Sequence, residues 1–103
     1  MKLMVKFQFP TETGNGIVGS GKINDIFQKL MEDLKPEAAY FYAVDGDRGG
    51  VLFVNATDSS EIVSIVEPFW FGLNAKVEVT PVMSAEDLTK GLAGIPGIVS
   101  RYH

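Results

Sequence analysis

The fold assignment depends on one glycine-rich segment: Gly14-Asn15-Gly16-Ile17-Val18-Gly19-Ser20-Gly21-Lys22. It is either a nucleotide-binding motif or a loop that connects a strand to a helix. The segment follows residues that alternate like a strand and precedes residues spaced like a helix. It matches the dinucleotide-binding pattern G-x-G-x-x-G from Gly14 to Gly19, and it nearly matches the phosphate-binding P-loop from Gly16 to Ile23. A true match would indicate a parallel α/β fold that binds nucleotides.

Neither nucleotide-binding pattern is complete. A P-loop needs Ser or Thr after its lysine to hold Mg²⁺, but Ile23 stands there and begins an apolar helical stripe. The dinucleotide pattern needs a tight turn directly after the strand, but residues 10–13 intervene, and the expected acidic residue falls at a helix end, at Glu32 or Asp33. We therefore predict that residues 11–21 form a flexible loop that binds no phosphate. Such a loop at one end of the sheet could act as a lid.

The first half of the chain shows a strand, a helix and a second strand. A period of two from Leu3 to Phe9 predicts a strand, which Pro10 ends. Helical spacing then predicts a helix over residues 23–34, with Ser20 as its N-cap and Pro36 as its stop. Residues 39–44 are rich in Tyr, Phe and Val and are expected to form the second strand.

The second half repeats this order. A turn over residues 45–50 leads into a strand over 51–56. A helix is expected from Asp58, which pairs with Glu61 as a capping box, and Pro68 should kink this helix or end it early. A strand over 75–82 and a short helix around Leu88 and Leu92 follow, the latter capped by Ser84 and Asp87, and residues 94–103 show no clear period.

The resulting order, β-α-β-β-α-β plus a C-terminal helix, predicts a ferredoxin-like α+β sandwich. Its four-stranded antiparallel sheet should have the strand order 4-1-3-2, with both main helices on one face. We expect residues 1–93 to form a single domain and residues 94–103 to form a C-terminal tail.

The two helices leave one face of the predicted sheet open. This face receives Met4, Lys6 and Gln8 from the first strand and Glu78 and Thr80 from the last. The second strand adds either Tyr40 and Tyr42 or the set Ala39, Phe41 and Ala43. Such a face is too apolar for water and too polar for a dry core. A second copy packed face to face would cover it and enclose a cavity suited to a small ligand.

The chain resembles the dimeric α+β barrel superfamily over about residues 2–93. The resemblance rests on the element order, on the segment Gly49-Gly50-Val51-Leu52-Phe53-Val54, and on Val79-Thr80-Pro81-Val82-Met83 followed by a capped helix. The latter ending is similar to that of small bacterial members with no assigned activity. The resemblance implies a homodimer with a pocket between sheet and helices or inside the barrel.

Other members of this superfamily are muconolactone isomerase-like enzymes, cofactor-free monooxygenases of the antibiotic-biosynthesis type, and haem-degrading or peroxidase relatives. Haem-handling members resemble one another in using a histidine as iron ligand. The only histidine here is the last residue, His103. We therefore expect no haem, and we predict neither a metal nor another cofactor.

Six side chains are candidates for lining a ligand pocket: Lys6, Gln8, Tyr40, Tyr42, Trp70 and Glu78. For Lys6 and Glu78 we favour a cross-strand ion pair at the edge of the dimer contact. The alternative is an acid–base pair, with Tyr40 or Tyr42 orienting a substrate. The helical spacing of Trp70 favours a core position over a pocket wall.

The expected function is therefore binding of a small apolar ligand by a homodimer, without a cofactor. The alternative is a cofactor-independent isomerase or monooxygenase-like enzyme that acts on a small metabolite, aromatic compounds included.

Charge and composition argue against other functions. Net charge is −4 and the basic residues are scattered singly, which is unlike a nucleic-acid-binding surface. The segment from Arg48 to Asn55 also lacks all three aromatic residues of the RNA-recognition strand. The run Asp45-Gly46-Asp47 lacks the spacing of a calcium loop and indicates a hairpin turn. With no cysteine, no signal peptide and no apolar run of ~18 residues, we expect a cytoplasmic protein without a membrane partner.

Overall fold

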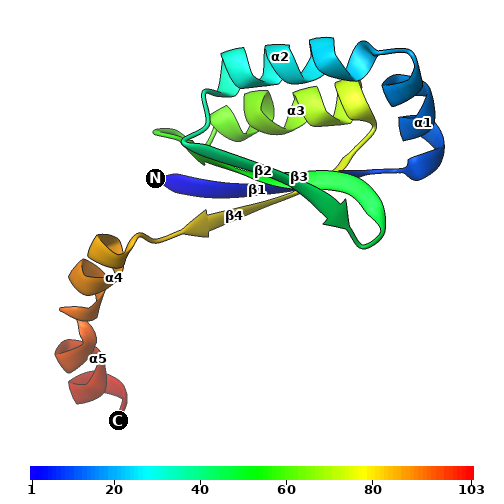
Figure 1. Cartoon of the computed structure of the whole chain (residues 1–103). Helices are drawn as coiled ribbons and strands as arrows, with labels where there is room; N and C mark the ends of the chain where they lie inside the picture. Colours follow the sequence, from blue (N-terminus) through cyan, green and yellow to red (C-terminus); the bar gives the residue numbers. More distant parts are fainter.

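A computed structural model describes residues 1–103 and contains four strands and five helices (Figure 1). In chain order the elements are β1 (Lys2–Phe9), α1 (Thr11–Gly19), α2 (Lys22–Leu34), β2 (Ala38–Val44), β3 (Asp47–Asn55), α3 (Glu61–Leu73), β4 (Lys76–Val82), α4 (Ala85–Leu92) and α5 (Ile95–Tyr102). The order β-α-β-β-α-β is that of the ferredoxin-like sandwich, with α1 inserted after β1.

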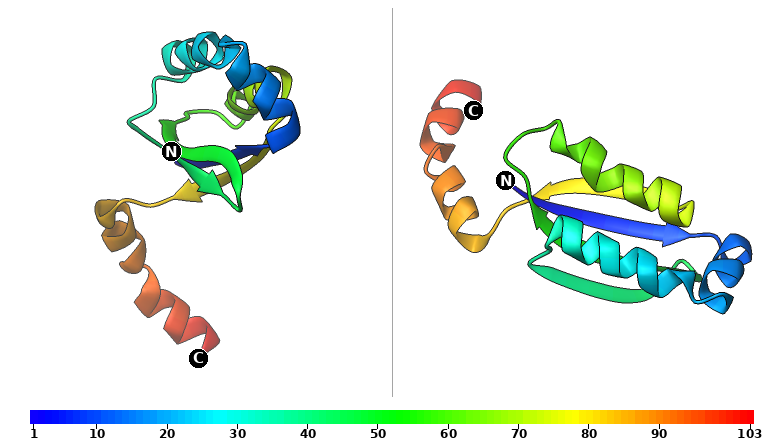
Figure 2. Two further views of the ribbon diagram at one scale, coloured as in Figure 1. Left: turned by 45° about the vertical axis from the view of Figure 1, so that its right-hand side comes forward. Right: turned by 90° about the horizontal axis from the view of Figure 1, so that it is seen from above.

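The four strands form one antiparallel sheet in the order β2-β3-β1-β4, which confirms the predicted order read from the other edge. Helices α2 and α3 lie side by side over one face (Figures 1 and 2). The other face carries none of the helices α1, α2 and α3, which together with the sheet form the sheet domain, residues 1–82. The predicted α+β architecture is thus confirmed, and so is its uncovered sheet face.

The core lies between the sheet and the helix pair. Every second residue of β1 is buried there, as the alternation predicts, and the ring of Phe7 lies 4.9 Å from that of Phe69 on α3. Leu30 of α2 and four residues of α3 complete the contact from above: Ile65, Val66, Phe69 and Leu73. Ile23, the residue that breaks the P-loop pattern, packs partly buried against this core.

The helix boundaries differ from the predictions in two places. Ser20 ends α1 instead of capping α2, whose N-cap is Gly21 in the left-handed conformation at φ 81°. Helix α3 begins at Glu61 instead of Asp58, because residues 58–60 form tighter turns in which each carbonyl accepts the backbone N–H three residues further on. Only half of the predicted capping box forms, since the Glu61 carboxylate accepts the backbone N–H of Asp58. Pro68 does not end α3 early, since the helix continues to Leu73.

The prediction of a flexible loop over residues 11–21 is wrong, because Thr11–Gly19 forms α1. Glycine has a poor helix propensity, which is why the sequence indicates a loop. Tertiary contacts outweigh that propensity here. Gly14 is buried so close to Phe9 that a Cβ atom would lie 3.0 Å from its ring, and Ile17 packs on the core. Arg48 also donates a hydrogen bond to Asn15 at 3.1 Å.

Helices α4 and α5, residues 85–102, form an arm that projects from the sheet domain (Figure 1). Helix α4 has the predicted capping box of Ser84 and Asp87. Residues 95–102 form a further helix, α5, where the sequence shows no clear period. The radius of gyration is 17.3 Å, against ~13 Å for a compact chain of this length, which reflects the projection of the arm.

Candidate functional site

The open sheet face brings five of the six predicted site residues together. Cross-strand register aligns Tyr40, Val51, Lys6 and Glu78 in one row across β2, β3, β1 and β4. The adjacent row is Tyr42, Gly49, Gln8 and Lys76, and the row on the other side is Ala38, Phe53, Met4 and Thr80. The structure also decides between the two alternatives for β2. Phe41 points to the helices, with its ring 5.2 Å from that of Phe27, so Tyr40 and Tyr42 belong to the open face.

One half of the open face is apolar. It comprises the side chains of β2 and β3 together with one residue of β1: Tyr40, Tyr42, Val51, Phe53 and Met4. Tyr40 is 63% exposed and Tyr42 48% exposed. Aromatic side chains of this size bury large areas when a partner covers them. A partner that covers this half would therefore bury more apolar surface than one that covers the rest of the face.

The other half of the open face, on β1 and β4, is polar. Lys6 and Glu78 lie directly opposite each other in the β1–β4 register, as predicted. They do not form the predicted ion pair. The single ion pair of the chain joins Lys2 and Glu37. The ammonium of Lys6 and the carboxylate of Glu78 are therefore left available to a third group on this face.

Gln8 belongs to a small polar cluster at one end of the face. Its side-chain amide donates to Asp47 at 3.3 Å, and the Thr11 hydroxyl donates to the other carboxylate oxygen of Asp47 at 2.8 Å. The hydrogen bond from Thr11 is the main cause that lowers the pKa of Asp47, with Gln8 and the charge of Lys76 adding to it. Asp47 thus stays ionised, and it orients the amide of Gln8.

Asp47 also borders a shallow concavity of about 460 Å³ beside the β2–β3 turn, which Tyr42, Thr11 and Arg48 line as well. Sequence reasoning assigned Asp47 only to a hairpin turn. The signal available in the sequence was that Asp47 is a polar residue next to Arg48, which pairs with the last residue of the alternating strand β1.

Trp70 does not join the other five candidates. It lies on α3, on the helix-covered side of the sheet, and is 50% exposed. The core position favoured for it belongs instead to its neighbour Phe69, which is fully buried. A concavity of about 590 Å³ also lies on the helix side, between the end of α2 and the start of α3, and Trp70 does not line it.

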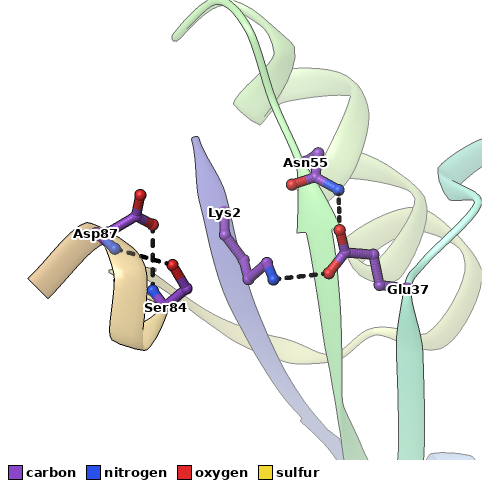
Figure 3. A network of polar contacts seen from close by, with 5 residues as sticks. All are labelled: Lys2, Glu37, Asn55, Ser84 and Asp87. Carbon is purple, nitrogen blue, oxygen red and sulfur yellow. Dashed lines mark hydrogen bonds and ion pairs between the residues drawn. The ribbon is translucent and has the colours of Figure 1, made fainter.

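A polar network joins three strands at the end of the sheet from which the arm departs (Figure 3). Lys2 on β1 contacts Glu37 at 2.8 Å, and Asn55 on β3 donates to the other oxygen of Glu37 at 2.6 Å. The hydrogen bond from Lys2 is the main cause that lowers the pKa of Glu37, and the same bond raises the pKa of Lys2. Sequence reasoning missed this network because Glu37 is far from Lys2 and Asn55 in the chain, and the three side chains meet only at one end of the folded sheet.

The base of the arm lies next to the same network. Ser84 and Asp87 exchange two hydrogen bonds of 3.1 Å, each from a backbone N–H to the other residue's side chain. The bond from the Ser84 backbone is the main cause that lowers the pKa of Asp87, and the charge of Lys2 adds to it. Lys2 therefore acts electrostatically on the first turn of α4 as well as on Glu37.

No group of three or more His, Cys, Asp or Glu side chains is placed to hold a metal ion. None of the helices combines the length and the apolar character needed to span a bilayer.

A four-stranded antiparallel sheet with two helices on one face defines a small ferredoxin-like α+β protein. The chain belongs to a family described as a domain of unknown function, DUF3303, whose model matches residues 1–95. No curated protein matches the chain. The matched residues include the whole sheet domain and α4, so the open face is part of the family domain.

Proposed function

We propose that two copies of this chain associate through their open sheet faces and hold a small, mostly apolar ligand between them. The observation that carries this proposal is the exposure of Tyr40 and Tyr42 beside Val51 and Phe53 on a face that no helix covers. Contiguous exposed apolar surface of this kind marks interaction sites. The resemblance to dimeric α+β barrels agrees with this arrangement.

The polar half of the face gives the proposed site its specificity. Ligand sites are mostly apolar and contain a few polar groups that orient the ligand. Lys6, Gln8 and Glu78 supply a cation, an amide and an anion within two adjacent rows. A ligand with an apolar body and one hydrogen-bonding group fits this distribution, and binding needs no cofactor.

The dimer is tested by its response to a charge placed at the centre of the face. We expect sedimentation analysis to show a dimer for the native chain at micromolar concentration and a monomer for Val51→Lys. Val63→Lys is the matched control, because Val63 is an exposed valine on α3, outside the open face. A monomeric native chain, or a dimer that survives Val51→Lys, contradicts the proposal.

Ligand binding is tested with the apolar fluorescent probe anilinonaphthalene sulfonate. We expect Tyr40→Ser to weaken binding of the probe, whereas Phe71→Ser, at an exposed aromatic on α3, should leave it nearly unchanged. Equal binding by both variants would place the probe elsewhere and count against a ligand site on the open face.

The juxtaposition of Lys6 and Glu78 favours a second candidate function, a cofactor-independent isomerase or monooxygenase-like enzyme. An acid and a base on facing strands, with Tyr40 in the same row, can move a proton on a bound substrate. Activity against a panel of small aromatic and lactone compounds tests this candidate. Loss of turnover in both Lys6→Met and Glu78→Gln, with the dimer intact, would support it, and full activity in both would exclude it.

A further inference from the structure

The arm formed by α4 and α5 makes no extensive contact with its own chain. Every residue from Ala85 to His103 is exposed. Figures 1 and 2 show the arm leaving the sheet domain after β4 and extending beyond the end of the sheet, toward the side opposite α2 and α3. It therefore points to the same side as the open face.

One side of the arm is apolar along its whole length. The apolar residues follow one another at spacings of four, three, four and three: Leu88, Leu92, Ile95, Val99 and Tyr102. Their exposed fractions run from 43% for Ile95 to 78% for Tyr102. The two residues between the helices, Ala93 and Gly94, keep right-handed helical backbone angles, so the apolar stripe continues from α4 into α5.

Helices as short as α4 and α5 need a surface to pack on. Each has 8 residues, whereas isolated helices below ~12–15 residues are only marginally stable in water. The capping box at Ser84 supports the first turn of α4 but leaves the apolar stripe in water. Most helix stability in proteins comes from packing such a stripe, so the arm is built for contact with a surface outside its own sheet domain.

We propose that the arm of each chain packs through this stripe against a second copy of the chain. This inference rests on the proposed dimer, because a copy that faces the open sheet lies on the side toward which the arm points. Face-to-face sheets lie ~10 Å apart, whereas about 18 helical residues span roughly 27 Å. The arm is thus long enough to pass the partner's sheet and reach the end of its helix layer.

Charge and symmetry favour a second copy over an unrelated partner. The arm carries two acidic residues, Glu86 and Asp87, and two basic residues, Lys90 and Arg101, so the net charge of −4 resides on the sheet domain. A neutral arm meets no repulsion from a second acidic copy. In a two-fold dimer each arm contact also occurs twice, and both stripes are covered without a further component.

Photo-cross-linking from a single cysteine tests the arm contact directly. The chain has no cysteine, so Val99→Cys gives one attachment point for a benzophenone maleimide. The full-length labelled chain is mixed with an isotopically heavy full-length chain, irradiated and analysed by mass spectrometry. We expect cross-links that join light and heavy chains.

The matched control is Ser100→Cys, because Ser100 is also exposed on α5 but lies outside the stripe. We expect it to cross-link far less than Val99→Cys. Cross-links within one chain would mean that the arm folds back on its own domain and would overturn the inference. Equal yields from the two positions, or none from Val99→Cys, would overturn it as well.

The same label at Tyr40→Cys separates this inference from the proposed dimer. Mixed cross-links from Tyr40→Cys alone refute the arm contact and leave the face-to-face dimer standing. Mixed cross-links from Val99→Cys alone support the arm contact and refute the face-to-face dimer, and none from either position refutes both.

A second measurement uses the dissociation constant of the dimer. Val99→Asp should raise it by roughly tenfold or more, the effect of losing a well-packed apolar contact. Ser100→Asp introduces the same charge beside the stripe and should change it much less. Because neither residue is buried in the sheet domain, both variants keep the fold. Equal dissociation constants for the two variants count against the arm contact.

Discussion

Lys2 and Glu37 form the only ion pair of the chain, with 2.8 Å between Nζ of Lys2 and Oε2 of Glu37. The pair joins the first residue of β1 to the residue just before β2, although β3 separates these two strands in the sheet. Asn55, at the end of β3, donates to the same carboxylate. The three side chains therefore bridge β1, β3 and the start of β2 at the end where the arm departs (Figure 3).

The first prediction concerns the pKa of Glu37. Removing its cationic partner with Lys2→Met should raise that pKa toward the ordinary value of 4.5, because the hydrogen bond from Lys2 is the largest cause of its depression. Titration of the Glu37 side chain by NMR measures the change. Lys29→Met, at an exposed lysine on α2, is the control and should leave the Glu37 titration where it is in the native chain. An unchanged pKa in Lys2→Met would contradict the ion pair in solution.

The second prediction concerns stability in acid. Five carboxyl groups have lowered pKa values in the folded chain: Glu37, Asp47, Asp58, Glu61 and Asp87. A lowered pKa means that the unfolded state binds more protons, so the contribution is complete above the unfolded values of 3.8 to 4.5 and is lost as pH falls through the folded values.

Urea unfolding at a series of pH values below about 5 should therefore show falling stability. Glu37→Gln removes one of the five groups and should make the fall shallower. None of the five residues is buried, so each contribution is modest. Stability that rises on acidification would show that these carboxylates are not held by the contacts seen here.

The sheet domain could be predicted from sequence because its pattern is local. The apolar residues Leu3, Val5 and Phe7 alternate with a mixed set that includes Met4 and Lys6, so one strand already defines a covered face and an open face. The register then follows from hairpin and crossover rules, which is why Lys6 and Glu78 could be expected opposite each other. The helix boundaries followed with errors of one to three residues.

The features that sequence reasoning missed depend on contacts between distant segments. Helix α1 contains three glycines, and its packing against Phe9 and Arg48 has no local signal. The partner of Lys2 was missed because Glu37 precedes a strand that is not adjacent to β1, and the ion pair forms only where the two side chains reach past β3 at the end of the sheet. Trp70 follows the apolar spacing of α3, but its large side chain lies at the edge of the buried stripe and remains half exposed.

The third prediction tests the core with two neighbouring phenylalanines of α3. Phe69 is 0% exposed and Phe71 is 89% exposed. Phe69→Ala should lower the free energy of unfolding by about 3–5 kcal/mol, because it removes a ring packed on Phe7 and leaves a cavity. Phe71→Ala should change it by less than about 0.5 kcal/mol. Urea denaturation measures both, and similar losses for the two variants would contradict the orientation of α3.

The last prediction tests whether residues 11–19 are helical in solution, using two glycines of α1. A Cβ atom at Gly16 would meet nothing within 4 Å, whereas one at Gly14 would lie 3.0 Å from the Phe9 ring and 3.1 Å from Arg48. Alanine in a helix interior is favoured over glycine, so Gly16→Ala should stabilise the chain by about 0.5–1 kcal/mol.

Gly14→Ala has the same intrinsic advantage in a helix, but it forces the Phe9 ring or the Arg48 side chain to move. Its free energy of unfolding should therefore be lower than that of Gly16→Ala by about 1 kcal/mol or more, because overpacking a tight site lowers stability by this amount. Thermal and urea unfolding of the two variants measure this difference. If residues 11–19 were instead a mobile loop, both alanines would have nearly the same small effect, because neither position would be held against Phe9.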